Sequence, residues 1–436
     1  MTKNPVIGNQ MKILVIKMKK IIISLIAVMA FGMNTTAASI DTDRTWYLAG
    51  EPLKVSVTFD NALIAYAELC DTYGMAAGTI INVKDGEGSG IIELPSNLHS
   101  GYYVLNVYTR DNVKVYNKLV AVINTLNKNN DDDIEWVKAE KCKVMAEGAA
   151  ELVNEKNAGL SENEGHIIKA RVKNVYDGDL FKGDQIVTSL SIIGKQIHYF
   201  EGKMVDDSTV VFNTFGVYGK QPLVLSARTS TGVNLPIEMI SPFAMLLPKK
   251  LPHLAFHYQR DEVEKRSIAM QRHQMAITPE KRELQLGVFD DEATEETVPL
   301  DYDDTLFGVK PFLTYNLDEY RQFLTIREVL VEYVGCVSKN KTNGIPHLYV
   351  TVDADEYHGL FPSLVLIDGM PVFDIEKLLS YDARRINYIN IYGGQYAFGN
   401  DLYNGILSFV TRSGQLTNYP IEHNMQYLVY EFPQSY

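Results

Sequence analysis

The sequence predicts a mainly β fold, with two β-sandwiches followed by a C-terminal α+β domain. Apolar and polar residues alternate over short runs between residues 39 and 248, which is the period of half-buried strands. After residue 316 a helical apolar spacing appears beside further β-rich runs. A chain of 436 residues suits about three domains. We therefore expect sandwiches over 39–125 and 166–248 and an α+β domain over 316–415.

The first 38 residues have the composition of a secretory signal peptide. A basic region at 18–20 precedes an apolar run over 21–32, and 36–38 offers small residues for cleavage. The apolar run is shorter than the roughly 20 residues that a membrane-spanning helix needs. We expect 1–38 to be removed, Met18 to be the true start, and the mature protein to be exported.

The first β segment shows the alternation most clearly. Leu53, Val55 and Val57 alternate with Lys54 and Ser56, as in a strand with one face on a core. Further β-rich runs follow at short spacing, which is typical of a sandwich.

Two stretches of this segment resemble the macroglobulin-like domain MG2. They are DRTWYLAGEPLKVSVTF (Asp43–Phe59) and LPSNLHSGYYVLNVYTRD (Leu94–Asp111). The resemblance implies an MG2-like β-sandwich over 39–125. No thioester motif is present, so the trapping chemistry of full macroglobulins is not implied.

Two connecting segments separate the domains. Residues 126–165 are expected to be a linker with a helix, because 134–160 is rich in Ala, Glu and Lys. The second sandwich, 166–248, reads as Ig-like, and 249–315 is expected to be a linker. It contains a short helix over Glu262–Gln274 and an acidic tract over Asp290–Glu296. We interpret the tract as a solvated connector, with a docking peptide or a calcium site as alternatives.

The C-terminal segment combines an amphipathic helix over Leu317–Val334 with strands, a short helix and a Gly-rich loop. Asp374 is expected to cap the short helix through Leu379. The residues interpreted as turn residues are Asp368, Gly369, Gly393, Gly394, Gly399, Gly405 and Gly414. A carboxylate pair of Asp368 and Asp374 for acid–base chemistry is the alternative reading, and local bonding is favoured.

Three blocks of this segment resemble the plug domain of TonB-dependent outer-membrane receptors. They are LVLIDGMPV (Leu364–Val372), INYINIYGG (Ile386–Gly394) and NGILSFVTRSG (Asn404–Gly414). The chain as a whole resembles exported proteins of Bacteroidetes-type bacteria that join MG2-like and plug-like domains. The resemblance implies a location in the periplasm or at the outer membrane, and an accessory role in assembly or uptake. Because only a short tail, 416–436, follows, we expect no barrel from this chain.

Aromatic side chains crowd the plug-like segment and predict a contact surface, because Tyr is large, rigid and polar at its tip. The candidate surface consists of Tyr388, Tyr392, Tyr396, Phe398 and Tyr403. The tail is expected to lie over another surface. We expect both sandwiches to fold without residues 316–436.

No motif for catalysis or for cofactor binding is present. There is no G-x-S-x-G, no H-E-x-x-H and no P-loop, and Cys70, Cys142 and Cys336 are too scattered for a disulfide framework, although which of them pair stays open. The net charge of −13 argues against nucleic acid as a partner.

The sequence therefore predicts a non-catalytic protein, with no metal or cofactor, that contacts an outer-membrane or other envelope protein. The alternative is a module that binds a carbohydrate or peptide for nutrient capture.

Overall fold

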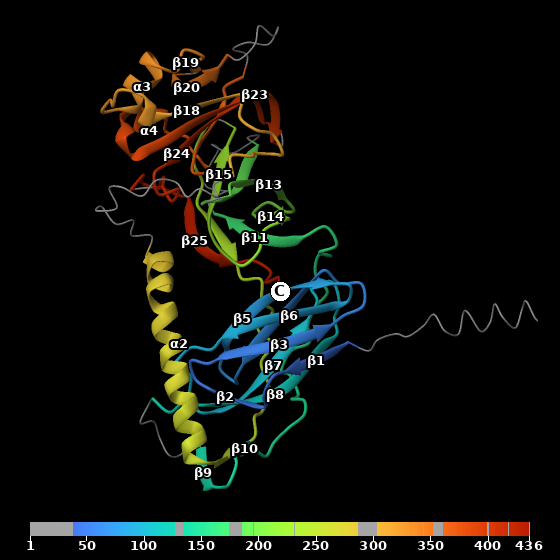
Figure 1. The fold of residues 1–436 in the computed structure, drawn as a ribbon. Coiled ribbons are helices and arrows are strands. Elements are labelled where there is room, and N and C mark those ends of the chain that lie inside the picture. Colours follow the sequence, from blue (N-terminus) through green and yellow to red (C-terminus); the bar gives the residue numbers. More distant parts are fainter. Residues whose placement is uncertain are drawn as a thin grey trace, which may run out of the picture.

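The structure, a computed structural model, describes residues 38–126, 134–173, 185–194, 196–230, 232–286, 303–342, 344–351, 361–398, 401–416 and 418–435. It confirms a mainly β chain, in which two β-sandwiches and a C-terminal α+β body are stacked along one axis (Figure 1). The expected signal peptide lies outside the described residues except for Ala38.

The first sandwich is the blue body of Figure 1. Leu53, Val55 and Val57 are buried while Lys54 and Ser56 are exposed, so this strand has one face on the core. Hydrogen bonds place the strands in the order β1-β3-β6-β5-β4-β7-β8-β2. The strands are β1 (Ser39–Thr42), β2 (Trp46–Leu48), β3 (Pro52–Thr58), β4 (Ile64–Cys70), β5 (Met75–Lys84), β6 (Glu87–Glu93), β7 (Gly101–Tyr108) and β8 (Val115–Ile123).

The helix expected within 134–160 is wrong. The chain instead forms β9 (Ile134–Lys138) and β10 (Lys143–Val144), which lie on either side of β17 (Leu254–Tyr258). Phe256 of β17 is buried between Trp46 and Trp136, with ring centroids at 4.9 and 5.7 Å. Pairing with a distant strand buries aromatic surface, and this outweighs the weak local preference for a helix.

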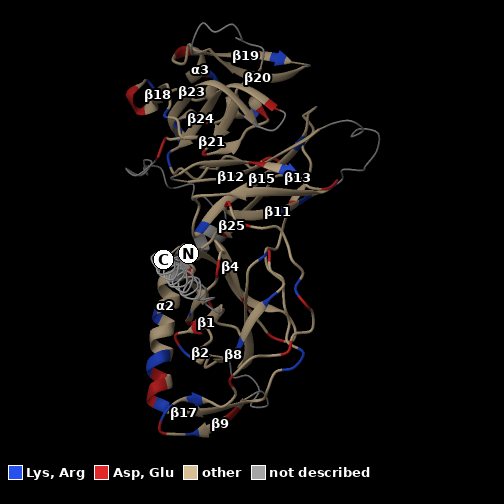
Figure 2. Cartoon of the chain, turned by 90° about the vertical axis from the view of Figure 1, so that its right-hand side faces the viewer, with Lys and Arg blue, Asp and Glu red and all other residues tan. Residues whose placement is uncertain are grey.

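The segment expected to be a linker, 249–315, contains β17 and a long helix, α2 (Arg260–Leu286), which extends well beyond Glu262–Gln274. Figure 1 shows α2 lying alongside the first sandwich, and Figure 2 shows both charge signs following one another along the part of α2 near β17. Arg266 explains the docking: its guanidinium lies 3.6 Å from the ring centroid of Trp46 and donates to Glu51. The acidic tract, 290–296, lies outside the described residues.

The second sandwich takes one of its strands from the C-terminal tail. Its strands are β11 (His166–Val172), β12 (Ile186–Ile192), β13 (His198–Met204), β14 (Thr209–Thr214), β15 (Lys220–Thr229), β16 (Ile237–Ile240) and β25 (Gln426–Glu431), in the order β16-β11-β14-β13-β12-β15-β25. The tail strand β25 runs antiparallel to β15, and Tyr430 and Phe432 enter the core of this sandwich. The boundary expected at residue 248 therefore leaves out part of the domain.

The tail continues from the second sandwich to the first. The backbone of Gln434 accepts from the N–H of Asn82 and donates to the carbonyl of Ile80, at 3.0 and 2.8 Å. Its side-chain amide also bonds both backbone groups of Ile91 on β6. The tail thus ties the two sandwiches together.

A buried carboxylate joins the sandwiches at a second point. Glu68 on β4 accepts hydrogen bonds from the backbone N–H of Met245 and Leu246, at 3.0 and 2.6 Å, and from the Tyr108 hydroxyl at 3.1 Å. A carboxylate taken out of water is stable only when such donors surround it. This contact fixes the chain that leaves the second sandwich against the first.

The C-terminal body is a five-stranded sheet in the order β18-β23-β24-β21-β22 with short helices. Its elements are β18 (Leu313–Asn316), the 3-10 helix η2 (Leu317–Glu319), α3 (Ile326–Glu332), the hairpin of β19 (Val337–Thr342) and β20 (Ile345–Val350), β21 (Leu364–Ile367), β22 (Met370–Pro371), α4 (Ile375–Ser380), the 3-10 helix η3 (Ala383–Arg385), β23 (Ile386–Phe398) and β24 (Asp401–Thr411). The helical part of 317–334 is thus much shorter than expected.

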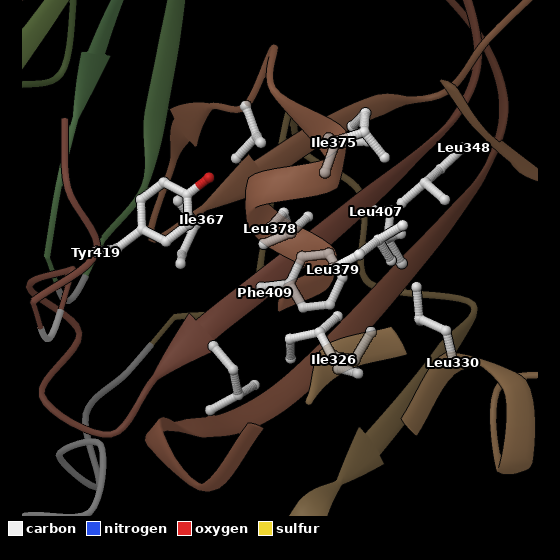
Figure 3. Packing of buried hydrophobic residues seen from close by; sticks show 14 of the residues in the cluster. Ile326, Leu330, Leu348, Ile367, Ile375, Leu378, Leu379, Leu407, Phe409 and Tyr419 are labelled. Atoms are coloured by element: carbon white, nitrogen blue, oxygen red, sulfur yellow. The ribbon is translucent and has the colours of Figure 1, made fainter. Parts of the chain in front are cut away.

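The core of this body lies between the sheet and the two α-helices. Figure 3 shows Ile375, Leu378 and Leu379 of α4 facing Leu407 and Phe409 of β24, and all five are buried. Asp374 caps α4, its carboxylate accepting from the N–H of Lys377 at 3.0 Å. The body therefore has its own hydrophobic core.

Candidate functional site

Two residues of the candidate aromatic surface are buried inside the molecule. Tyr392 and Tyr403 pack with Tyr199 in an apolar cluster between the C-terminal body and the second sandwich. The Tyr392 hydroxyl donates to the carbonyl of Asp304 at 2.6 Å, and the Tyr403 hydroxyl accepts from Arg228 Nη2 at 2.7 Å. The expectation that these two form an exposed contact surface is wrong, because the neighbouring domain covers them.

The other residues of that surface are not gathered into an exposed patch. Tyr388 and Tyr396 are half-buried on β23. The Tyr396 hydroxyl donates to the carbonyl of Gly393 at 2.9 Å, and its ring lies 6.1 Å from that of Phe307. The side chain of Phe398 lies outside what the structure describes.

Asp368 and Gly369 form the turn between β21 and β22, with positive φ angles of 47° and 91°. A Cβ on Gly369 would lie 2.6 Å from Cγ2 of Ile197 in the second sandwich. The turn therefore needs glycine both for its backbone angle and for its close approach to the neighbouring domain.

The Gly-rich loop expected between two strands is shorter than predicted, because β23 extends to Phe398 and β24 begins at Asp401. Gly393 and Gly394 lie within β23, where the register shifts, and Gly405 lies within β24. A bulge of this kind uses glycine without ending the strand. Gly414 follows β24 with φ of 66°, and Gly399 lies outside the described residues.

Asp368 is a buried carboxylate held by three donors. It accepts from the N–H of Thr411 at 2.8 Å, from the Thr411 hydroxyl at 2.6 Å and from the N–H of Leu416 at 2.6 Å. Burial raises its pKa to about 6, against the bonds that favour the charged form. Asp374 is engaged as a helix cap, so the two carboxylates each have a local structural role.

A different group of aromatic side chains lies half-buried at the surface of the C-terminal body. The four side chains are Tyr315, Tyr320, Phe323 and Tyr333. The ring of Tyr333 lies 4.6 Å from that of Tyr320 and 5.3 Å from that of Phe323, measured between centroids. The ring of Tyr315 lies 6.2 Å from that of Tyr320. We call these four residues the aromatic patch. They come from β18, from the segment after η2 and from the end of α3.

Exposed aliphatic side chains accompany the aromatic patch. Leu324 is 64% exposed and Val331 is 75% exposed, although both lie in or beside α3. The opposite face of α3 is fixed to the core by Ile326, Val329 and Leu330. The buried residues on one side of α3 hold it to the core, so the exposed apolar side chains are not needed to stabilise the helix.

The start of α3 is set by a capping box. Thr325 caps the helix, its hydroxyl accepting from the N–H of Glu328 at 3.4 Å, and the Glu328 carboxylate accepts from the N–H of Thr325 at 3.0 Å. The Tyr333 hydroxyl donates to the carbonyl of Arg321 at 3.2 Å. This bond joins the end of α3 to the segment that precedes the helix.

The apolar residues of 317–334 have helical spacing, and such spacing predicts that they form a buried stripe on one side of a helix. Phe323 and Tyr333 follow that spacing and are only half-buried. Sequence reasoning missed Val331 of α3 and Leu324 just before its N-cap, two apolar side chains that are exposed to solvent.

No group of three or more His, Cys, Asp or Glu side chains is placed to hold a metal ion in the part of the chain that the structure describes. Cys70, Cys142 and Cys336 are free thiols, and burial raises the pKa of Cys70 and of Cys142. Among the described helices, none has the length and hydropathy needed to span a bilayer.

A scan against protein-family models finds no match, and no curated protein matches the sequence. Among solved structures, trypsin-activated α2-macroglobulin from Escherichia coli is 14% identical, with a TM-score of 0.18 over 47% of this chain and 15% of that chain. Methylamine-reacted α2-macroglobulin from Salmonella is 12% identical, with a TM-score of 0.18 over 46% of this chain and 14% of that chain.

The BSP domain of a biofilm-associated protein is 10% identical, with a TM-score of 0.17 over 49% of this chain and 30% of that chain. The chain thus spans less than a third of each of these three proteins. None of the three supports the plug resemblance of 316–415. The β-sandwich fold rests on the strand pairing described above.

Proposed function

We propose that the protein is a non-catalytic protein of the cell envelope that binds a protein partner through the aromatic patch. The observation that supports this function is the exposure of Leu324 and Val331 beside the four half-buried rings. Aromatic side chains and Arg are enriched in protein contacts, and exposed apolar patches with a polar rim mark interaction sites. The rim here includes Arg321, which is exposed.

The partner we propose is an extended protein segment with apolar side chains. Tyr315 belongs to β18, and β18 is the outermost strand of the five-stranded sheet. An edge strand has unpaired backbone groups on its outer side and accepts an added strand. A segment paired along β18 would place alternate side chains near Tyr315 and its aromatic neighbours.

The biological setting we propose is the periplasm or the outer membrane, with an accessory role in assembly or uptake. The support is the signal-like composition of residues 1–38. The partner is then an outer-membrane or other envelope protein. Capture of a carbohydrate or peptide for nutrient uptake is the alternative function.

Replacing Leu324 or Val331 by Asp is expected to reduce partner recovery at least tenfold. A carboxylate in a desolvated contact loses its water without gaining a partner, and a loss of about 1.4 kcal/mol already corresponds to tenfold in affinity. The measurement is the yield of one defined adduct after photo-crosslinking, in the cells that produce the protein, from a photoreactive residue placed at Arg321.

The matched control is Tyr73→Asp, because Tyr73 is 93% exposed on the first sandwich, far from the patch. Its adduct yield should equal that of the wild type, and all variants should melt at the same temperature. Equal yields from Leu324→Asp and wild type would reject the patch as the contact surface. Binding of the purified chain to a glycan array, with no protein adduct, would favour the alternative function.

A further inference from the structure

A cavity of about 640 Å³ lies where the first sandwich meets the second. Its walls come from the end of β7, from the extended segment 154–157, from β11 and from the chain after β16. The lining residues are Tyr108, Arg110, Asn154, Glu155, Lys156, Asn157, Lys169, Ile240, Ser241, Pro242, Ala244 and Leu246. This volume is in the range of pockets that bind small ligands.

The lining carries an excess of positive charge although the chain is strongly acidic. Arg110, Lys156 and Lys169 line the cavity together with one acidic residue, Glu155, whereas the whole chain has a net charge of −13. Burial lowers the pKa of Lys156 and of Lys169, and the positive charge of Arg110 adds to this, while Asp111 opposes it at Lys156 and Glu162 opposes it at Lys169. A bound anion would favour the charged form of both buried lysines.

Two of the three cations are engaged by the protein. Lys156 Nζ donates to the carbonyls of Arg110 and Asn157, at 2.9 and 3.2 Å, and this fixes the segment 154–157 over the cavity. Arg110 Nη1 donates to Glu162 at 3.0 Å and to the carbonyl of Ile167 at 2.7 Å.

Donors remain for a ligand. Nε and Nη2 of Arg110, and Nζ of Lys169, make no hydrogen bond within the part of the chain that the structure describes. The Arg110 side chain is itself only 11% exposed and is held over the Tyr66 ring at 4.9 Å. Its guanidinium is therefore pre-oriented, and a fixed guanidinium with a nearby ammonium suits a carboxylate.

The uncharged residues of the lining indicate which class of carboxylate ligand the cavity suits. Ile240, Pro242, Ala244 and Leu246 contribute apolar residues to the lining, and Asn154 and Asn157 are among its polar residues. An acidic sugar would present hydroxyl groups to that apolar side, whereas a peptide presents alkyl side chains and amide groups. We propose that the cavity binds the C-terminal carboxylate of a short apolar peptide, with Lys169 and Arg110 as its cationic contacts.

The test uses affinity selection with mass spectrometry on the purified mature chain. The probe is a pool of tripeptides of Ala, Val, Leu and Phe with free carboxylates, offered beside the same pool as C-terminal amides. The free acids are expected to be retained and the amides to bind at least tenfold more weakly, because the amide removes the charge that the cations recognise.

Lys169→Met keeps the aliphatic stem and removes the ammonium, so it should weaken retention of the free acids at least tenfold. The matched control is Lys220→Met, because Lys220 is exposed on β15 of the same sandwich and does not line the cavity. This control should bind like the wild type.

Three results would overturn the assignment: no free acid retained at millimolar concentration, acids and amides retained equally, or Lys169→Met binding like the wild type. Retention of oligomers of glucuronic acid in place of the tripeptides would overturn the peptide assignment in the same way. None of these readouts depends on the aromatic patch, so the test is independent of the proposed function.

Discussion

A chain that ends at Glu422 is expected to lose the folded second sandwich while the first sandwich stays folded. The truncation removes β25 and with it Tyr430 and Phe432, which are 6% and 0% exposed in the core of that sandwich. Loss of a buried aromatic side chain costs about 3–5 kcal/mol, and a domain has only about 5–15 kcal/mol in total. The truncation also leaves Nε2 of the buried His166 without the Tyr430 hydroxyl, which lies 2.7 Å away.

Hydrogen exchange measured by mass spectrometry checks this prediction. Peptides from β11, β12 and β15 should exchange at the rate of unfolded chain, whereas β3 and β7 should stay protected. Tyr430→Phe is the graded control, since it removes only the hydroxyl and should lower the free energy of unfolding by about 1–3 kcal/mol. Protection of β15 in the truncated chain would show that the tail strand is dispensable.

Asp368→Ala is expected to destabilise the C-terminal body by about 3–5 kcal/mol. The substitution leaves the backbone N–H groups of Thr411 and Leu416 buried without an acceptor, and each such group costs about 1–3 kcal/mol. Alanine is also disfavoured at φ of 47°, where Asn is tolerated. Asp368→Asn, which keeps one acceptor and the shape, should therefore cost clearly less. Urea unfolding at pH 7 measures both, and equal losses would contradict this account.

The pH dependence of Asp368 gives a second readout at the same residue. Its pKa is raised from 3.8 to about 6, so the folded state holds the proton more tightly than the unfolded state. The contribution of protonated Asp368 to the stability of the folded state is present in full below about pH 4 and is lost as the pH rises to about 6. Because one pKa unit corresponds to about 1.4 kcal/mol, Asp368→Asn should gain about 3 kcal/mol relative to the wild type across this window. A difference that stays constant between pH 4 and 7 would contradict the raised pKa.

Sequence reasoning succeeded where neighbours along the chain decide the structure. The alternation of Leu53, Val55 and Val57 identifies a strand because a period of two needs no knowledge of the partner. Asp374 could be recognised as a cap for a similar reason, since the bond it makes is to a residue three positions away.

Sequence reasoning failed where a distant partner decides the structure. The segment that starts at Ile134 has a helical composition but pairs with β17, more than a hundred residues later. The tail looked like a surface segment because β15, its partner, lies about two hundred residues earlier. Tyr392 and Tyr403 have the composition of a contact surface, and they do form one, but with the chain's own second sandwich.

The origin of β25 in the tail also bears on the order in which the molecule folds. His166 and Tyr430, which share a hydrogen bond inside the second sandwich, are 264 positions apart. Loop-closure entropy of this size slows folding, and a chain that emerges from its N-terminus first cannot complete such a domain early. The first sandwich takes its strands from one contiguous stretch, so it can form while the rest of the chain is still being synthesised. The second sandwich must keep an open edge at β15 until the last part of the chain arrives, and in that interval it is the part most exposed to mispairing.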